Sequence, residues 1–309
     1  MAPLPHGGLL VSVAGARFGR FPGRPRAVTP GVGRPRAWRR RASFGILATG
    51  ALCVAYGYFV EPYWPEVTHV RIVSSRLGPG ARPIRVVLLS DLHSDPKPRL
   101  EDRLPALVMA QRPDLVVYTG DSINSLDALP VFRRCMTRLA AIAPTFAVRG
   151  NWDSWYWGDV DLFGGTGVRE LDGHAERVDV GGASVWIGGV AVGHEQLVQR
   201  ALEEIPGGGP ALFLYHYPYP DVLPEGARGK VDLYCTGHTH GGQVALPLYG
   251  AIITLTKYGK RYEAGLYRVG ALWMYVNRGI GLEGGRAPRV RFFARPEITV
   301  VEIEPEARS

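Results

Sequence analysis

Three apolar runs constrain the fold of this 309-residue chain more than any other feature of its sequence. IRVVLLS at 84–90, LVVY at 115–118 and TFAV at 145–148 are almost continuously apolar, which is typical of strands buried on both faces. Helical stretches are predicted between them, near 100–111 and 126–140. Strands that alternate with helices in this way form a parallel sheet, so the sequence predicts an α/β fold.

The second half of the chain is predicted to be rich in strands and poor in helices, so we expect a second sheet stacked on the first. Its apolar runs lie at 184–190, 211–216, 231–237, 266–269, 272–277 and 297–303.

Polar side chains follow several of these strands at the point where the strand ends. Ligands collect at the carboxyl ends of strands in open α/β sheets. Each residue alone is explained by capping the next helix or by an ordinary polar contact. Together they supply nitrogen and oxygen ligands for two metal ions that share a bridging carboxylate. The seven residues are Asp91, His93, Asp121, Asn151, His216, His238 and His240.

The residue types also indicate which metals fit. Two divalent cations about 3.5 to 4 Å apart bridge a hydroxide, lower its pKa and neutralise charge on phosphoryl oxygens. Imidazole, carboxylate and amide ligands suit Mn, Fe or Zn better than Ca. Cys53, Cys135 and Cys235 are far apart and form no C-x-x-C pair, so we expect buried thiols rather than metal ligands or disulfides.

The order of the motifs resembles the calcineurin-like metallophosphoesterases. DLH, GD, GN, a lone His and GHTH occur in that order between residues 84 and 303, and GHTHGGQ with NRGIG and RPEIT is similar to a membrane-associated bacterial subgroup. The resemblance implies a four-layer α/β/β/α sandwich. It places Asp91, His93, Asp121 and His240 around one metal, and Asp121, Asn151, His216 and His238 around the other.

The resemblance further implies hydrolysis of a phosphoester or pyrophosphate bond in a phosphorylated small molecule or lipid. Some relatives cleave the pyrophosphate of UDP-2,3-diacylglucosamine, which is one substrate class to expect by analogy. We take as catalytic candidates Asp121, Asn151, His216 and Asp153. The alternative is a metal-binding scaffold with reduced turnover. A seven-ligand set favours the enzyme, because a structural role needs no open pair of metals.

Trp152 departs from the family, which usually has His after Gly-Asn. An indole N–H donates a hydrogen bond but does not exchange a proton near neutral pH, so general-acid help from this position is lost. His194 is an alternative proton donor if its loop folds over the site, and an exposed loop residue otherwise. Substrate-binding candidates are Trp152, Arg149 and Arg278.

Aromatic residues crowd the stretch VRGNWDSWYWGD at 148–159. Amphipathic Trp and Tyr side chains at the mouth of a site suit a substrate with an acyl portion. The alternative is a hydrophobic lid that packs on the protein itself.

The N-terminal region is predicted to anchor the protein. Residues 1–41 carry nine Arg and no Asp or Glu, and their Pro, Gly and Arg content predicts a disordered tail. The uncharged run at 42–60 is long enough to span a bilayer, and Tyr56, Tyr58, Tyr63 and Trp64 fall where an interfacial aromatic belt is expected. A core helix and a cleaved or uncleaved export signal are the alternatives.

Charge asymmetry predicts the topology. Arg on the N-terminal side favours a single-pass protein of the cell membrane with its catalytic domain outside the cytoplasm. Residues 61–83 are expected to form a linker and a first edge strand, and residues 84–309 the metallophosphoesterase domain. Outside the basic tail the chain has 27 Lys and Arg and 28 Asp and Glu, so it is close to neutral and no nucleic-acid partner is expected.

Overall fold

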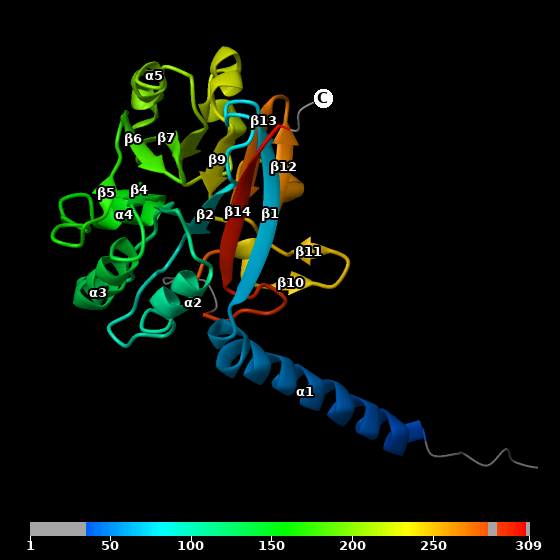
Figure 1. Ribbon diagram of the computed structural model, residues 1–309. Helices are drawn as coiled ribbons and strands as arrows, with labels where there is room; N and C mark the ends of the chain where they lie inside the picture. Colours follow the sequence, from blue (N-terminus) through cyan, green and yellow to red (C-terminus); the bar gives the residue numbers. More distant parts are fainter. Residues whose placement is uncertain (1–34, 284–288, 307–309) are drawn as a thin grey trace, which may run out of the picture. The chain divides into compact units, whose positions relative to one another are not determined.

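The three parallel strands predicted from the sequence lie side by side in one sheet. The computed structural model describes residues 35–283 and 289–306. In the order β1-β14-β2-β3-β4-β5, strands β2 to β5 are parallel, β14 is antiparallel to β2, and the edge strand β1 is parallel to β14 (Figure 1). The bounds are β1 Glu66–Ser74, β2 Ile84–Leu89, β3 Leu115–Tyr118, β4 Thr145–Ala147, β5 Arg169–Glu170 and β14 Glu297–Pro305.

A second six-stranded sheet has the order β12-β13-β9-β8-β7-β6, and a separate two-stranded hairpin is formed by β10 and β11. Strands β13, β9, β8 and β7 are parallel, and the two edge strands are antiparallel to their neighbours. The bounds are β6 His174–Val180, β7 Ala183–Gly189, β8 Ala211–Leu214, β9 Leu233–Thr236, β10 Ala245–Leu246, β11 Gly250–Ala251, β12 Gly265–Val269 and β13 Leu272–Val276.

The central strands are buried on both faces, as their continuous apolar character predicts. In β2, Val86 and Leu88 belong to a core that also contains Leu212 and Leu214 of the other sheet. The alternate residues of β2 face a different core, which they share with α2 and α3. Because successive strand residues point to opposite faces, one run of apolar residues joins two cores. The predicted mixed α/β fold is confirmed.

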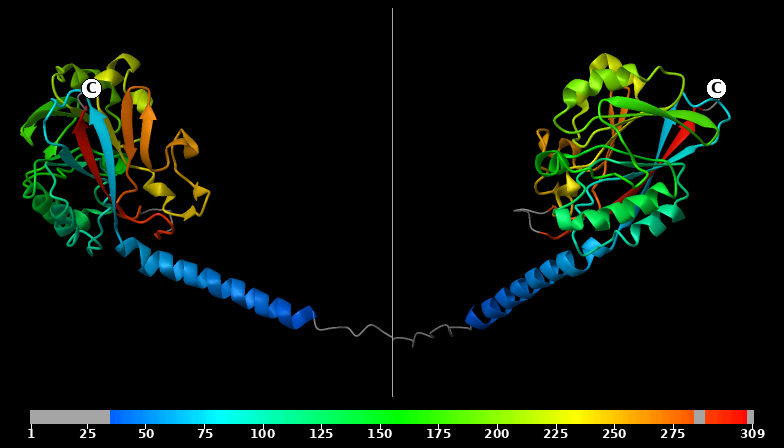
Figure 2. Two further views of the ribbon diagram at one scale, coloured as in Figure 1. Left: turned by 45° about the vertical axis from the view of Figure 1, so that its right-hand side comes forward. Right: turned by 90° about the vertical axis from the view of Figure 1, so that its left-hand side faces the viewer.

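Helices cover the outer faces of the sheets. Helices α2 and α3 lie together against the β2 and β3 side, and α5 contributes to a third core with β8, β9 and β13 (Figure 2). The α-helices are α1 Pro35–Phe59, α2 Leu104–Ala110, α3 Leu129–Ala140, α4 Asn151–Tyr156 and α5 Val198–Glu203. The 3₁₀ turns are Glu61–Tyr63, Leu126–Ala128, Glu195–Leu197, Pro220–Val222, Glu225–Lys230, His240–Gly242 and Gly259–Tyr262.

Helix α1 begins at Pro35, inside the stretch predicted to be a disordered tail. A proline at the first helical position costs no hydrogen bond, and the arginines that follow are good helix formers, so the helix extends ahead of its apolar part. The remainder of the predicted tail, residues 1–34, lies outside the described residues. The chain divides into two units, Met1–Ile46 and Leu47–Ser309.

One helix among the described residues is long and apolar enough to cross a membrane, within Trp38–Tyr63. Only 6% of its most apolar stretch is buried, which argues against the core-helix alternative. Its large apolar side chains, such as Phe44 and Leu52, are exposed.

Phe146 in β4 offers a test of the core between the sheets, where it is fully buried. We expect Phe146→Ala to lower the free energy of unfolding by about 3 to 5 kcal/mol, because it removes an aromatic ring and leaves a cavity. Urea unfolding of the full chain in detergent, followed by tryptophan fluorescence, measures the change. Met109→Ala, at an exposed position of α2, is the control and should change it by less than about 0.5 kcal/mol. Equal effects of the two variants would contradict the assignment of this core.

Candidate metal centre

The seven predicted ligands all follow the carboxyl ends of strands. Asp91 and His93 follow β2, Asp121 follows β3, Asn151 begins α4 after β4, and the remaining three histidines follow β8 and β9. The strands are parallel neighbours within each sheet, so these ends meet at one edge.

Five of the seven residues adopt the left-handed backbone region, which costs of order 1 to 3 kcal/mol for a residue other than glycine. Strain of this kind persists only where the surrounding structure fixes it, and it is concentrated at functional sites. Here backbone hydrogen bonds hold it: the Asp91 amide donates to the Gly120 carbonyl at 2.8 Å, and the His93 amide to the Asp121 carbonyl at 2.9 Å. The φ angles are 50° for Asp91, 38° for His93, 60° for Asp121, 71° for His238 and 51° for His240.

The glycines of the GD and GN motifs allow two loops to approach closely. A Cβ atom on Gly120 would lie 2.1 Å from the Gly150 nitrogen, and one on Gly150 would lie 2.1 Å from Asp121 Oδ1. Both contacts are too short for any side chain, so glycine is required at each position. The close approach brings the loops after β3 and β4 together at the site.

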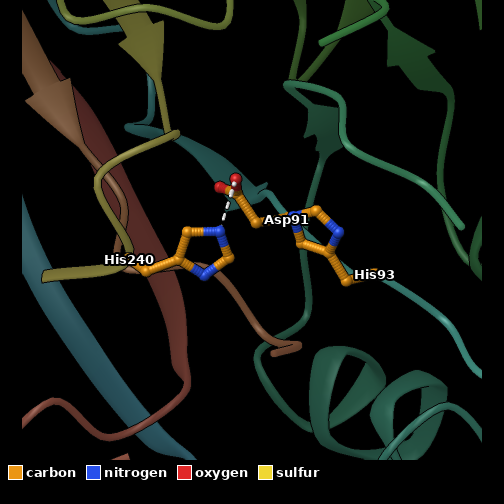
Figure 3. Close-up of side chains that lie close together, drawn as sticks. All are labelled: Asp91, His93 and His240. Carbon is orange, nitrogen blue, oxygen red and sulfur yellow. Dashed lines mark ion pairs between the residues drawn. The ribbon is translucent and has the colours of Figure 1, made fainter. Parts of the chain in front are cut away.

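The side chains form two groups, and within each group the potential ligand atoms lie within 4.8 Å of one another. In the first group His240 Nε2 points at the Asp91 carboxylate, 3.3 Å from Oδ1, and His93 lies on the other side of that carboxylate (Figure 3). The second group consists of Asp121, His216 and His238.

Asp121 lies between the two groups. Its Oδ2 atom is 3.4 Å from His93 Nε2 in the first group and 3.3 Å from His216 Nε2 in the second. One carboxylate oxygen therefore reaches both groups, as a bridging ligand must.

Unpaired polar atoms show that these residues fit divalent metal ions. His93 Nε2, His216 Nε2 and Asn151 Oδ1 are buried and have no hydrogen-bond partner among the described residues. A buried polar atom without a partner costs about 1 to 3 kcal/mol, so three such atoms at one place indicate a missing ligand. Imidazole nitrogen with carboxylate and amide oxygen is a donor set for Mn, Fe or Zn.

The opposite nitrogen of each imidazole is held by the protein. His216 Nδ1 lies 2.7 Å from the Thr119 carbonyl, and His93 Nδ1 lies 3.1 Å from Asn124 Oδ1. Each acceptor fixes the proton on Nδ1 and leaves the Nε2 lone pair free for a metal. Asn124 was not among the site residues predicted from the sequence, although it stands three residues after Asp121, in the same loop.

Burial and neighbouring charges both shift the pKa values of the histidines in these groups. Burial lowers the pKa of His216, but the Asp121 carboxylate overcomes this effect and raises that pKa to about 9. Burial and the charge of His216 lower the pKa of His238 to about 3. Because a metal binds the unprotonated Nε2 of His216, metal binding competes with protonation of that nitrogen and weakens in acid.

Comparisons with known proteins agree with this geometry. The profile of the family described as Calcineurin-like phosphoesterase matches residues 84–242. The chain belongs to the calcineurin-like phosphoesterase family. Over 291 residues it is 32% identical to the metallophosphoesterase YkuE of Bacillus subtilis. The alignment covers 85% of this chain and 96% of that protein.

Two further relatives are similar over most of this chain. Phosphodiesterase YaeI of Escherichia coli is 32% identical over 286 residues, covering 86% of this chain and 98% of that protein. A Bos taurus protein named as a transmembrane protein with metallophosphoesterase domain is 29% identical over 290 residues, covering 85% of this chain and 62% of that protein. The family resemblance read from the motifs is confirmed, and the chain is a metal-dependent phosphoester hydrolase.

Asp153, one of the four catalytic candidates, lies outside the two groups that could hold a metal ion. Its buried carboxylate accepts hydrogen bonds from the backbone amides of Asp121 and Ser122, both at 2.8 Å, and from that of Gly150 at 3.1 Å. Burial and the charge of Asp121 raise the pKa of Asp153 to about 6. Asp153 is a positioning residue that ties the GD loop to the GN loop.

The two predicted substrate-binding arginines are occupied by other partners. The Arg149 guanidinium pairs with Glu170 and donates to the carbonyls of Trp157 and Val160, at 3.0 and 2.8 Å. Arg278 Nη2 lies 2.7 Å from Glu66 and 3.3 Å from Glu297. In this structure both guanidinium groups are therefore engaged by carboxylates of the protein, and binding of substrate phosphate by either arginine stays a prediction.

Trp152 lies directly against the first ligand group. Its ring meets His93 edge to face, with the centroids 5.4 Å apart, and its amide donates to Asp121 Oδ1 at 2.8 Å. Its buried Nε1 has no acceptor among the described residues. Trp155 and Tyr156 next to it are exposed, so the aromatic stretch is not simply core. His194 instead pairs with Asp172 at 2.6 Å.

Asp121→Ala tests the bridging assignment. We expect the variant to lose at least one metal ion per chain and to hydrolyse phosphoesters at the background rate, because one carboxylate serves both groups. Elemental analysis of the purified full chain, together with an assay on an aryl phosphodiester, measures both effects. Asp172→Ala removes a partly buried carboxylate outside both ligand groups, which pairs with His194 and accepts from the Ala191 amide, and it should retain its metals and activity. Retention of two metals and full activity by Asp121→Ala would exclude this site.

Proposed function

We propose that this phosphoesterase is anchored in the cell membrane and uses two metal ions to cleave a phosphoester or pyrophosphate bond of an amphiphilic substrate. The observation that carries the proposal is the Asp121 carboxylate between two groups with unpaired imidazole nitrogens. When bound, two divalent cations activate water and neutralise the charge on the phosphoryl oxygens during displacement.

The residues divide into two sets of ligands. Asp91, His93 and His240 would hold one ion, and Asn151, His216 and His238 the other, with Asp121 shared between them. The Nδ1 contacts of His93 and His216 keep these rings oriented before substrate arrives. Trp152 contributes a hydrogen-bond donor beside the first set and excludes water from it, but it supplies no proton.

A cavity of about 550 Å³ beside the ligands supports an amphiphilic substrate. His238 and His240 line one part, and the rest is largely apolar. Phosphate at the metals and an acyl chain in the cavity account for both parts, and UDP-diacylglucosamine is one such compound. The apolar residues of the lining are Val244, Ile252, Ile253 and Leu255.

The membrane location is supported by α1 and by the relative named as a transmembrane protein. Arginine on the N-terminal side of the apolar run favours a cytoplasmic N-terminus, which puts the hydrolase domain outside the cytoplasm.

The proposal is tested on the purified full chain in phospholipid nanodiscs. Metal content is measured first, and then hydrolysis of a panel of alkyl and aryl monoesters, diesters, pyrophosphates and lipid phosphates. We expect activity that a chelator abolishes and that Mn, Fe or Zn restores. A chain that retains two metals but hydrolyses nothing on the panel would support the scaffold alternative and overturn the proposed function.

Trp152→His tests the absence of a general acid. Without an acid the leaving oxygen departs as an anion, which penalises alkoxides more than phosphate or phenolate. We expect the variant to raise kcat/KM for alkyl esters by up to about 10²-fold to 10⁴-fold and to raise it less for aryl esters of matched size. No gain on alkyl esters in either Trp152→His or its combination with His194→Ala would contradict this account.

The anchor is tested by fractionation. We expect the full chain to remain in membranes washed with high salt or carbonate and to enter solution only with detergent, because α1 exposes its apolar side chains. Mass spectrometry of the recovered protein establishes whether residues 35–59 are present. Full-length chain in the soluble fraction would refute the anchor, and a cut near residue 60 would favour the export signal.

A further inference from the structure

The β10–β11 hairpin exposes a cluster of large apolar side chains. We define the apolar hairpin as residues 244–255. Leu248 at its turn is fully exposed, and Ile253 is 61% exposed. A contiguous apolar surface of this kind in a folded protein marks an interaction site. Its exposed members are Leu246, Leu248, Tyr249, Ile252, Ile253 and Leu255.

The base of the apolar hairpin is joined to a segment that carries another exposed ring. Val244 forms a β-bridge with Phe292, and the Ala245 amide donates to the Phe292 carbonyl at 2.8 Å. Phe293, the next residue, is exposed. Phe292 in turn meets Tyr56 of α1 edge to face, with the ring centroids 6.1 Å apart. The hairpin is therefore connected through one segment to the end of the apolar helix.

That connection is fixed by buried polar contacts. The Arg291 amide donates to the Gly57 carbonyl at 2.9 Å. The buried carboxylate of Glu61 accepts hydrogen bonds from the amides of Phe293 and Ala294, at 3.0 and 2.6 Å. Three hydrogen bonds therefore hold this segment to the end of α1, and the β-bridge joins the same segment to the hairpin.

Basic and aromatic residues surround this surface. The Lys260 ammonium pairs with Glu263 and lies 4.2 Å from the Tyr249 ring centroid, and the Arg295 guanidinium lies 4.1 Å from that of Trp64, which is exposed. Arg261 is exposed, and its guanidinium lies 5.3 Å from the Tyr262 ring centroid. Aromatic rings paired with cations are typical of the bilayer interface, where the cations meet anionic headgroups. The same positive charges would repel one another in a face-to-face contact of two copies.

We propose that the apolar hairpin and Phe293 insert into the bilayer interface beside the end of α1. The inference rests on the membrane anchoring proposed above and names the surface that completes it. His238 Nε2 lies 3.2 Å from the carbonyl of Leu255 at the end of the hairpin, so the inserted segment adjoins the metal ligands. The cavity is lined by Ile252, Ile253 and Leu255 of this segment, so the acyl chain of a membrane lipid enters the cavity from the bilayer while its phosphate reaches the metals.

The insertion depth of Leu248 tests the proposal without reference to activity. The full chain with Cys53→Ala and Leu248→Cys carries a nitroxide at position 248, while Cys135 and Cys235 are buried and stay unlabelled. The protein is reconstituted in vesicles of phosphatidylcholine and phosphatidylglycerol. We expect the nitroxide to collide more often with oxygen and less often with a water-soluble nickel chelate than the same label at Met109→Cys, an exposed position on α2.

The outcomes separate the possible occupants. Collision rates at Leu248→Cys equal to those at Met109→Cys would place the hairpin in water and overturn the proposal. Shielding from both reagents, with dipolar coupling between labels, would show that a second copy covers the hairpin and would also overturn it. Accessibility to oxygen alone supports insertion.

A pair of substrates with the same leaving group separates this proposal from the proposed function. Leu248 does not line the cavity, so Leu248→Ser should leave hydrolysis of methyl p-nitrophenyl phosphate unchanged. We expect it to reduce kcat/KM for hexadecyl p-nitrophenyl phosphate in vesicles at least about tenfold, since burial of one Leu corresponds to that factor or more. Equal rates for variant and parent on both substrates would contradict insertion. Hydrolysis of neither substrate by the parent would count against the proposed function, and the depth measurement would still decide on the hairpin.

Discussion

The carboxylate of Asp121 is the constraint on which the rest of the site depends. It is buried, it lies within 3.4 Å of an imidazole nitrogen from each ligand group, and its backbone is left-handed. Burial alone would raise its pKa, but the neighbouring His216 and His93 hold that pKa well below its ordinary value. The fold surrounds this negative charge with imidazole groups. It also holds the strained backbone of Asp121 through the hydrogen bond that the Asp121 amide donates to the Asp153 carboxylate.

The parts of the site that follow from strand order could be predicted from the sequence. A parallel sheet brings successive strand ends to one edge, so Asp91, Asp121 and Asn151 had to lie near one another whatever the loops did. The mixed α/β fold followed from the same continuous apolar runs. Short or solvent-facing strands were harder: β6 is polar along much of its length because only part of it is buried, and it has no continuous apolar run.

The roles of Asp153, Arg149 and Arg278 could not be read from the sequence because they depend on loop conformation. A charged residue next to a metal motif looks the same whether it faces the substrate or the protein backbone. Asp153 sits two residues from Asn151, yet α4 turns its carboxylate toward the amides of the GD loop. Arg149 and Arg278 pair with carboxylates that are far from them in the sequence, and such partners leave no local sequence pattern. The contact between Asn124 and His93 could not be predicted for the same reason.

Arg291 shows that the end of α1 is part of the fold rather than a tether. Its fully buried guanidinium has no carboxylate partner among the described residues. It donates instead to the carbonyls of Gly279, Gly281 and Ala294, while Nη2 lies 3.4 Å from His240 Nδ1. Its backbone amide is bound to Gly57 in α1. Because a buried arginine without a counter-charge is costly, these carbonyls must be held in place. Arg291 therefore contacts both a candidate metal ligand, His240, and the end of α1, and the boundary of the compact unit lies inside α1 rather than after it.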